Sequence, residues 1–510
     1  MNQDDIYNKL VSICGKDDVS IDDADLIATG DWIAKGLEAI YKDISFKAGF
    51  LVTPKNKEEI MKILQLANDK KIPIIPRAAN TSYGGQVLPV YPNTIMMDFG
   101  KHMNKILEIN LDEEFCVVEP GVEFWVLQHE LAKKGYFFPA EPGSAFACML
   151  GGMVGNNASG ATSFRFGTTR DYTKGLEVVL ASGKVIKTGS HRKGTEKSVS
   201  GYDLTSLFVG SEGTLGIFTE ITLKIQPYPK HEVSIVVAFG DLDKCFYAID
   251  KIRGMGLNLA LLEYADEMTL DGMNKNFKFQ LKQGKIEKKM KVPKKAGTIL
   301  IKIIGSHEKY VKEDLERLQK LITSEEFAEK EPKILILESP IDQEILWNAR
   351  HNAGPGLARS MAPPTVPRMF IPAVLDVAVP PKKISEFLKE AKEIATSHGF
   401  LPITFGHVMD GNVHLISAQN MTDENMAKIK EFQEKILDKV FSFGGTITAE
   451  HGIGLWKQQF LEKEFGKETI EAMRMIKRAF DPNNILNPGK MALDEEIPKI
   501  VFFEELGEKK

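Results

Sequence analysis

Over residues 46–227, short runs of β-forming hydrophobic residues alternate with stretches of helical periodicity. Phe50–Val52 predicts a strand, and Pro54–Asp69 predicts an amphipathic helix. Residues 71–76 predict a second short strand, which must lie at a sheet edge or only begin there, because Pro73 has no N–H to donate to a neighbouring strand. This alternation predicts a first α+β domain.

The next part of the chain, residues 228–445, places longer helical patterns between its strands. The strands expected there include 234–239 and 299–304, and the helices include 314–322 and 384–398. This pattern predicts a second α+β domain. The ends of the chain complete the expected organisation, with a helical segment over residues 1–45 and a C-terminal helical segment, residues 446–510, that returns to the first domain.

Composition narrows the class of protein. The chain has 510 residues, of which 43% are hydrophobic and 26% charged, as expected for a globular protein of more than one domain. A net charge of -5 gives no attraction to nucleic acid. The start of the sequence lacks the basic and apolar regions of a secretory signal, and no stretch approaches a membrane span, so a cytoplasmic location is expected.

Cysteine usage points to a reducing compartment. The four cysteines, none of them in a Cys-x-x-Cys pair, are Cys14, Cys116, Cys148 and Cys245. This spacing argues against a disulfide scaffold and against an iron–sulfur cluster held by this chain alone.

A lysine-rich stretch runs from Lys275 to Lys295, with nine lysines and a single acidic residue, Glu287. Such a run usually forms a solvated surface. The alternative is a docking patch for an acidic partner or for the anionic surface of a membrane, where the protein would bind peripherally. The sequence leaves both interpretations open, and it does not determine whether the chain forms a homodimer.

Glycine-rich loops are the strongest chemical signal in the first domain. No Gly-x-Gly-x-x-Gly motif occurs, so the sequence does not support a Rossmann dinucleotide site. Instead, an apolar run leads into a loop of small residues over 76–85, whose backbone N–H groups could line a cradle for a pyrophosphate. Three more such segments follow at 142–144, 151–160 and 210–221. Several loops of small residues suggest backbone packed closely against something large and flat.

These segments, in this order, resemble the FAD-binding domain shared by the vanillyl-alcohol oxidase and p-cresol methylhydroxylase flavoproteins. The fold that the resemblance implies is a two-part FAD-binding domain with a cap domain, residues 228–445, built on an antiparallel sheet. The resemblance implies that a loop matching Arg77 to Ser82 holds the FAD pyrophosphate, and that the residue matching Asn487 approaches the isoalloxazine ring. The residues it assigns to FAD are Arg77, Ala78, Ala79, Asn80, Thr81, Ser82, Pro142, Gly143, Ser144, Gly151, Gly152, Asn156, Ser159, Gly160, Gly216, Ile217 and Asn487. Asn80 stands where the family usually has glycine, and asparagine tolerates the same positive φ. No residue for covalent attachment is evident, so noncovalent FAD is expected.

Two histidines in the cap domain lie in a segment that predicts a β-hairpin, residues 403–416. If Asp410 and Gly411 form the turn, His407 and His414 are direct cross-strand partners with Cβ atoms ~5 Å apart. If the turn is shifted by one residue, the two are diagonal neighbours on the same face, and only a three-residue loop would separate them. Two imidazoles on one face suit a divalent metal with an anionic third ligand, for which Glu450 is the candidate.

The hairpin and the Glu-His-Gly-Ile-Gly motif that begins at Glu450 resemble those of D-lactate dehydrogenases, glycolate oxidase catalytic subunits and D-2-hydroxyglutarate dehydrogenases. The resemblance implies that His407, His414 and Glu450 bind zinc or manganese, that His451 is the base, and that Arg350 holds the substrate carboxylate. The chemistry agrees with these roles: a chelated metal lowers the pKa of a hydroxyl group, and a histidine can take its proton near neutral pH.

The sequence therefore predicts an FAD- and metal-dependent enzyme that oxidises a small D-2-hydroxy acid, D-lactate or glycolate, to the 2-keto acid with hydride transfer to flavin N5. The electrons would pass to a ferredoxin-type or electron-transfer flavoprotein partner, or to a quinone. Two rivals are a non-catalytic FAD-binding subunit, expected to lack the hairpin and Glu-His motifs, and a transferase like alkyl-dihydroxyacetone-phosphate synthase, expected to carry a run of histidines in the cap.

Overall fold

The computed structural model describes residues 3–30, 46–195, 197–330, 332–353, 375–418 and 423–494. The described residues fall into two compact units. Unit 1 contains those within 1–160, 167–228 and 450–500, and unit 2 contains those within 161–166 and 229–449.

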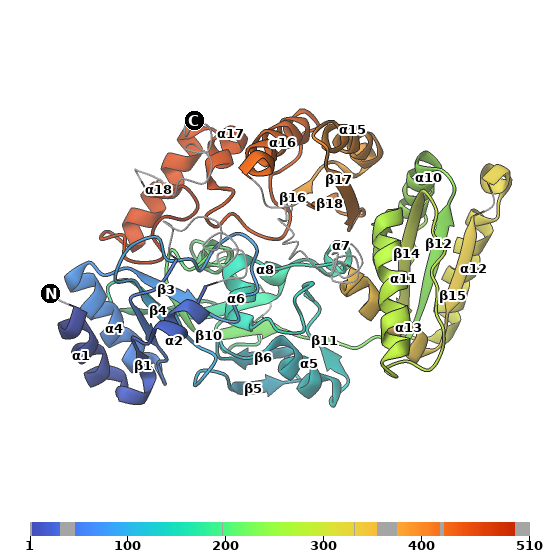
Figure 1. The fold of residues 1–510 in the computed structure, drawn as a ribbon. Coiled ribbons are helices and arrows are strands. Elements are labelled where there is room, and N and C mark those ends of the chain that lie inside the picture. Colours follow the sequence, from blue (N-terminus) through green and yellow to red (C-terminus); the bar gives the residue numbers. More distant parts are fainter. Residues whose placement is uncertain are drawn as a thin grey trace. The chain divides into compact units, whose positions relative to one another are not determined.

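Unit 1 contains a four-stranded sheet in the order β1-β2-β4-β3, in which β2, β4 and β3 are parallel and β1 is antiparallel (Figure 1). Its strands are β1 (Val19–Ser20), β2 (Phe50–Val52), β3 (Ile74–Arg77) and β4 (Ile95–Asp98). The predicted strand before the first glycine-rich loop is thus β3, and it lies at the edge of the described sheet, as its prolines require. The C-terminal segment returns here, because Leu486 forms a parallel bridge with Ile74.

The helix predicted from Pro54 begins three residues later, as α4 (Lys57–Lys70). The side chain of Asn56 accepts a hydrogen bond from Glu59 N and caps the first turn, and Lys71 ends the helix with a left-handed φ of 53°. The apolar face of α4 packs with α1 (Gln3–Cys14) into one hydrophobic core that also contains Ile217 and Leu486. This core joins the N-terminal, middle and C-terminal parts of unit 1.

A second sheet of unit 1 is antiparallel, in the order β5-β6-β10-β8-β9. Its strands are β5 (Ile106–Asn110), β6 (Phe115–Val118), β8 (Thr173–Val179), β9 (Val185–Gly189) and β10 (Ile217–Lys224), while β7 (Tyr136–Phe137) pairs separately with β11 (Gln226–Pro227). The other helices of the unit are α2 (Asp23–Ala28), α5 (Phe124–Ala132), α6 (Leu150–Asn156), α8 (Thr169–Tyr172), α9 (Leu204–Phe208), α17 (Leu461–Phe465) and α18 (Lys467–Phe480).

Unit 2 is built on a seven-stranded antiparallel sheet, the arrangement predicted for the cap, in the order β15-β12-β14-β13-β17-β18-β16. Its strands are β12 (His231–Phe239), β13 (Leu259–Ala265), β14 (Gly297–Gly305), β15 (Lys333–Leu337), β16 (Leu375–Ala378), β17 (Leu401–Gly406) and β18 (Asn412–Ala418). Its helices are α7 (Ser163–Phe166), α10 (Leu242–Gly254), α11 (Glu267–Lys282), α12 (Glu308–Ile322), α13 (Pro340–His351), α15 (Ile384–Ser397) and α16 (Asp423–Ser442). Helices α11 and α13 pack on the sheet in one apolar core (Figure 1).

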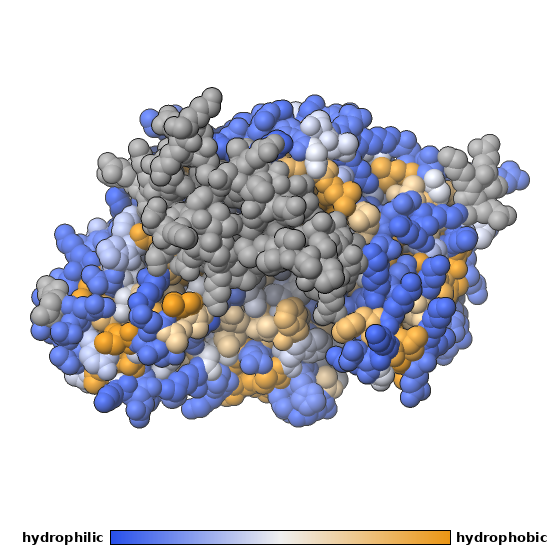
Figure 2. Space-filling model, viewed as in Figure 1, coloured by the Kyte–Doolittle hydropathy of each residue, from blue (hydrophilic) through white to orange (hydrophobic). Residues whose placement is uncertain are grey.

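The lysine-rich stretch covers the end of α11 and the loop after it, and most of its lysines are exposed. Lys275 forms an ion pair with Asp271 at 2.5 Å, and Lys288 forms one with Asp342 at 3.2 Å. Exposure of this kind fits a solvated surface, and the docking alternative remains a hypothesis. On the face drawn in Figure 2, the described residues are mostly hydrophilic, with hydrophobic ones in separate small groups. Among the described helices, none is long and apolar enough to cross a membrane.

Candidate active site

The segments predicted to bind FAD lie in unit 1, and backbone contacts bring them together. Arg77 ends β3, the residues 78–82 and 142–144 are in loops, 151–156 are in α6, and Ile217 begins β10. A Cβ added at Gly152 would meet Ala78 at 3.3 Å, so α6 approaches the loop after β3. Glu212 N donates to Gly155 O at 2.8 Å, and Asn487 Nδ2 donates to Glu212 O at 2.7 Å. Four segments that are far apart in the sequence therefore meet at one place.

Glycine is required in these segments for two different reasons. The sequence analysis predicted close approach to something large and flat, and close packing against protein is the second reason. At Gly151, Gly160 and Gly216 an added Cβ would collide with Pro120, Glu141 and Val178, so the protein itself fills that space. At Gly143 and Gly155 an added Cβ would meet nothing within 4 Å. Close packing against protein thus explains the first three glycines, and only the last two face open space that a flat ligand could fill.

Four buried polar atoms in these segments have no hydrogen-bond partner in the described part of the chain. They are Arg77 Nε, Asn80 Oδ1, Ser211 Oγ and Asn487 Oδ1. A buried polar atom left unsatisfied costs about 1–3 kcal/mol, so such atoms gathered in one place suit a polar ligand such as FAD. Asn80 has the positive φ, 57°, that the usual glycine would have, and its Nδ2 donates to Thr29 O.

The hairpin of unit 2 brings the two predicted metal-binding histidines together, but with a different register. Phe405 is the cross-strand partner of His414, and Gly406 is the last residue of β17, so His407 lies in the turn. Of the alternatives predicted for the turn, direct pairing of His407 and His414 across Asp410 and Gly411 is therefore not the one observed, because residues 407–411 separate β17 from β18. The rings remain neighbours, with centroids 5.5 Å apart. Both side chains are buried.

Each histidine has a buried carboxylate beside its Nδ1, and the sequence interpretation missed both acids. Glu263 Oε1 of β13 lies 3.1 Å from His407 Nδ1, and Asp376 Oδ1 of β16 lies 3.7 Å from His414 Nδ1. Burial raises the pKa of Glu263, but Arg350 and His407 outweigh it and hold the pKa at about 2. A signal for Glu263 existed, since it is an acid inside the apolar run of β13, where a charge needs a partner.

Arg350 is buried and paired within unit 2. Its Nε and Nη2 donate to the two carboxylate oxygens of Glu263 at 2.6 and 3.1 Å, and its guanidinium lies 4.4 Å from the ring centroid of Phe405. The planar fork is thus held rigidly between a carboxylate and an aromatic ring. This pairing uses the Nε–H and one of the two N–H groups of Nη2.

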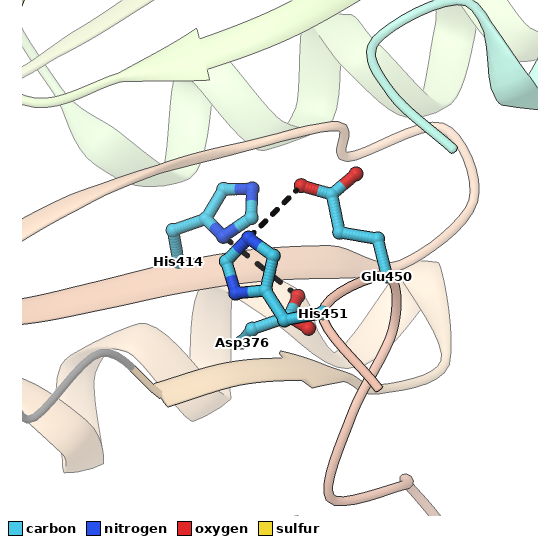
Figure 3. A group of neighbouring side chains, drawn as sticks. All are labelled: Asp376, His414, Glu450 and His451. Carbon is cyan, nitrogen blue, oxygen red and sulfur yellow. Dashed lines mark ion pairs between the residues drawn. The ribbon is translucent and has the colours of Figure 1, made fainter. Parts of the chain in front are cut away.

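The Glu-His motif follows a segment fixed to β16. Ala449 N and Thr448 Oγ1 donate to Asp376 Oδ2 at 3.2 and 3.0 Å, and Glu450 and His451 come next in the chain. One ligand atom from each of Asp376, His414, Glu450 and His451 lies within 4.8 Å of the others (Figure 3). His451 Nε2 is 3.6 Å from Glu450 Oε1. Of the three predicted metal ligands, His414 and Glu450 belong to this group, with His407 beside His414.

Unit 1 contains a second group of histidine and acidic side chains, formed by Glu177, His191 and Glu220. Lys57 pairs with Glu177 at 3.0 Å, and Arg192 binds Glu220 with two hydrogen bonds at 2.7 and 2.9 Å. Because cationic side chains already neutralise both acids, this group is a structural ion-pair network.

The sequence matches two protein families, described as "FAD binding domain" over residues 48–189 and "FAD linked oxidases, C-terminal domain" over residues 228–491. Glycolate oxidase subunit GlcD of Bacillus subtilis (strain 168) is 33% identical over 454 residues, which cover 88% of this chain and 90% of that protein. A D-lactate dehydrogenase of Anaerostipes hadrus is 32% identical over 444 residues, which cover 86% and 89% of the two chains.

Among solved structures, p-cresol methylhydroxylase with substrate bound has a TM-score of 0.75 at 19% identity, covering 96% of this chain and 97% of that one. An alkyldihydroxyacetonephosphate synthase has a TM-score of 0.73 at 19% identity, covering 95% and 85%. At these identities the likeness establishes the fold alone. The α+β flavin-binding fold predicted from the sequence is thus confirmed.

Proposed function

Since the chain belongs to the FAD-linked oxidases, in the group of D-lactate dehydrogenases and GlcD, we propose that it oxidises a small D-2-hydroxy acid to the 2-keto acid with FAD and a divalent metal. D-Lactate and glycolate are the proposed substrates, after the relatives named for them. The electrons then pass to a separate acceptor, a ferredoxin-type or electron-transfer flavoprotein or a quinone.

The observation that carries the proposal is the pair of buried histidines backed by carboxylates. A histidine that binds metal usually donates its other ring N–H to a carboxylate, which fixes the tautomer and orients the ring. Glu263 lies 3.1 Å and Asp376 lies 3.7 Å from the Nδ1 atoms of His407 and His414, so each ring has a carboxylate near Nδ1, at Asp376 beyond hydrogen-bond distance. Nε2 of each ring is then the atom left to bind a metal.

The charges of the group also suit a divalent cation. Glu263 is balanced by Arg350, whereas Asp376 and Glu450 add two carboxylates beside His414. An anionic substrate would be repelled by these carboxylates, and a divalent ion would balance them. His407, His414 and Glu450 would hold zinc or manganese, which suits a mixed imidazole and carboxylate site. The metal supplies a positive charge that lowers the pKa of the substrate hydroxyl.

The unsatisfied polar atoms of unit 1 and the open space at Gly143 and Gly155 suit a noncovalent FAD, which supplies the hydride acceptor. His451 takes the hydroxyl proton, and the carboxylate oxygen Oε1 of Glu450 lies 3.6 Å from its Nε2. Arg350, fixed by Glu263, orients the substrate carboxylate.

Two other functions are less well supported. A non-catalytic FAD-binding subunit has no need of the hairpin histidines and the Glu-His motif, and this chain has both. A transferase like alkyldihydroxyacetonephosphate synthase shares the fold, but the run of histidines expected in its cap is absent from this sequence.

Anaerobic reduction of the bound flavin tests the proposal. The purified protein is mixed without oxygen with D-lactate, glycolate or D-2-hydroxyglutarate, and the flavin absorbance is followed before and after EDTA. We expect one acid to bleach the flavin rapidly, EDTA to abolish the bleaching, and added zinc or manganese to restore it.

Two variants complete the experiment. His451→Asn should retain FAD and lose at least about 100-fold in the bleaching rate, as expected for a lost general base, whereas His129→Asn, an exposed histidine of α5, should match wild type. A yellow protein that no hydroxy acid bleaches, with metal present, would favour the transferase or the assembly subunit. A colourless protein that takes up no FAD would contradict the cofactor assignment.

A further inference from the structure

We infer that Glu212 and Gln86 are positioning residues for the reaction, because their side chains hold the loop that carries His451. The inference rests on the proposed function, in which His451 is the base. The His451 loop is defined here as residues 450–455. Glu212 comes from the loop before β10, and Gln86 from the loop after β3, both within unit 1 as is His451.

Three hydrogen bonds connect these side chains to the loop. Glu212 accepts one from Ile453 N at 2.7 Å and one from Gly454 N at 2.8 Å, through its two carboxylate oxygens. Gln86 Nε2 donates to the carbonyl oxygen of His451 at 2.8 Å. Both side chains are buried, so water does not compete for these bonds. Hydrogen bonds to a charged group are about twice as strong as neutral ones.

Glu212 makes this contact in an energetically unfavourable state. Its φ is 51°, a left-handed value that non-glycine residues rarely adopt, and its side chain is a buried acid. Each of these features is unfavourable by itself. They occur together at the one residue of the 210–216 loop that reaches the His451 loop with two acceptors, which favours a specific role over simple packing.

The glycines of the His451 loop fit the same contact. Gly452 has a φ of 76°, and an added Cβ there would lie 2.6 Å from Glu212 Oε1 and 2.8 Å from Gln86 Nε2. Gly454 has a φ of 55°, and an added Cβ would collide with the carbonyl oxygen of Gly84. Only glycine lets the backbone after His451 approach these side chains so closely.

A second layer holds the two positioning residues in turn. Asn487 Nδ2 donates to Gln86 O at 2.9 Å and to Glu212 O at 2.7 Å, so one side chain joins both loops. Gln86 Oε1 also accepts from Gly84 N at 2.9 Å. The His451 loop is therefore fixed to the backbone of three glycine-rich segments of the flavin-binding unit. A base held in this way keeps its position relative to the flavin, on which the rate of the proposed reaction depends.

The test compares Glu212→Gln with Glu119→Gln, a control in which another carboxylate of unit 1 becomes an amide whose oxygen can keep the single hydrogen bond from Lys105 N. In Glu212→Gln one of the two acceptors becomes an amide donor facing an N–H. We expect amide hydrogen exchange in residues 450–455 to become faster. The limiting rate of flavin reduction should fall by about 10- to 100-fold, because a small displacement of a catalytic group has that effect. FAD content and KM should change far less.

If Glu212 had a merely structural role, the variant would have a changed melting temperature and FAD content. The limiting rate would then not fall while KM stays nearly unchanged. If Glu212→Gln fails to retain FAD, Gln86→Met decides instead. At similar side-chain volume it removes the donor to His451, the acceptor for Gly84 and the hydrogen bond to the Glu212 side chain. Unchanged exchange in the loop, or faster exchange with an unchanged reduction rate, overturns the inference. Failure of the proposed function is seen separately, in the wild-type protein that no hydroxy acid reduces, while loop exchange in the variants still measures the contact.

Discussion

Glu263 is the residue at which three separate parts of unit 2 meet. It lies in β13, its partner Arg350 comes from α13, and His407 comes from the turn after β17. A single buried carboxylate thereby neutralises the arginine proposed to hold the substrate and orients a histidine proposed to bind the metal. Removing one member of a buried ion pair leaves the other charge without compensation, which is far more costly than exchanging both for apolar groups.

This reasoning predicts a strong coupling between Glu263 and Arg350. Glu263→Gln and Arg350→Met should each lower the free energy of unfolding by about 3–5 kcal/mol, and the double variant should lose clearly less than the sum. Urea unfolding of the four proteins measures the coupling. The exposed pair Lys383–Glu386 is the control, for which a coupling of about 1 kcal/mol or less is expected. Additive effects at Glu263 and Arg350 would show that the pair does not act as a unit.

At the scale of elements, Asp266 fixes the strand that leads to the metal-binding hairpin. One carboxylate oxygen caps α11 by accepting from Thr269 N at 2.9 Å, and the other accepts from Thr404 N of β17 at 2.7 Å. Asp266 is buried, so both donors would be left unsatisfied without it. The start of a helix and the register of a neighbouring strand thus depend on one side chain.

Asp266→Ala should therefore destabilise the protein by about 2–4 kcal/mol, the sum expected for a lost cap and an unsatisfied buried donor. Asp241→Ala removes the cap at Lys244 N of α10 and should cost about 1 kcal/mol. Urea unfolding of both variants gives the comparison. Equal losses in the two would contradict a role of Asp266 beyond capping.

At the scale of the whole molecule, the four cysteines are free and buried, which agrees with the absence of a disulfide scaffold in the sequence interpretation. Burial raises the pKa of Cys116 to about 12, and it is also the largest cause of the raised pKa, about 12, of Cys14 and Cys148. The pKa of Cys245 is raised by burial as well. A thiol with a raised pKa forms almost no thiolate near neutral pH, and the thiolate is the reactive form.

The folded protein should therefore resist alkylation by iodoacetamide at about pH 8, whereas the urea-unfolded protein should be labelled at all four cysteines. Mass spectrometry of both samples counts the labels. Rapid labelling of the folded protein at any of the four would show that the thiol is exposed by local opening of the unit that contains it.

The sequence by itself determined the α+β fold class and the presence of a flavin-binding domain followed by a second α+β domain, because glycine-rich motifs, turn residues and hydrophobic periodicity are local signals. The resemblance of the Glu-His motif likewise indicated the group of enzymes, which the relatives confirm. The tertiary structure decided the strand register and the side-chain packing, which local sequence signals do not specify. The length of the turn at His407 set the register against His414, and packing showed that Gly151, Gly160 and Gly216 face protein.

Only the tertiary structure revealed the partners of Glu263, Asp376 and Glu212, and the physical reason is the same for all three. Burial of a carboxylate is unfavourable unless a donor or a cation compensates it, so each must have partners. The partners lie 87 residues away for Glu263 and Arg350, and 241 residues away for Glu212 and Ile453. Which donor meets which acid depends on the register of strands and the path of loops, and no spacing within the sequence specifies that.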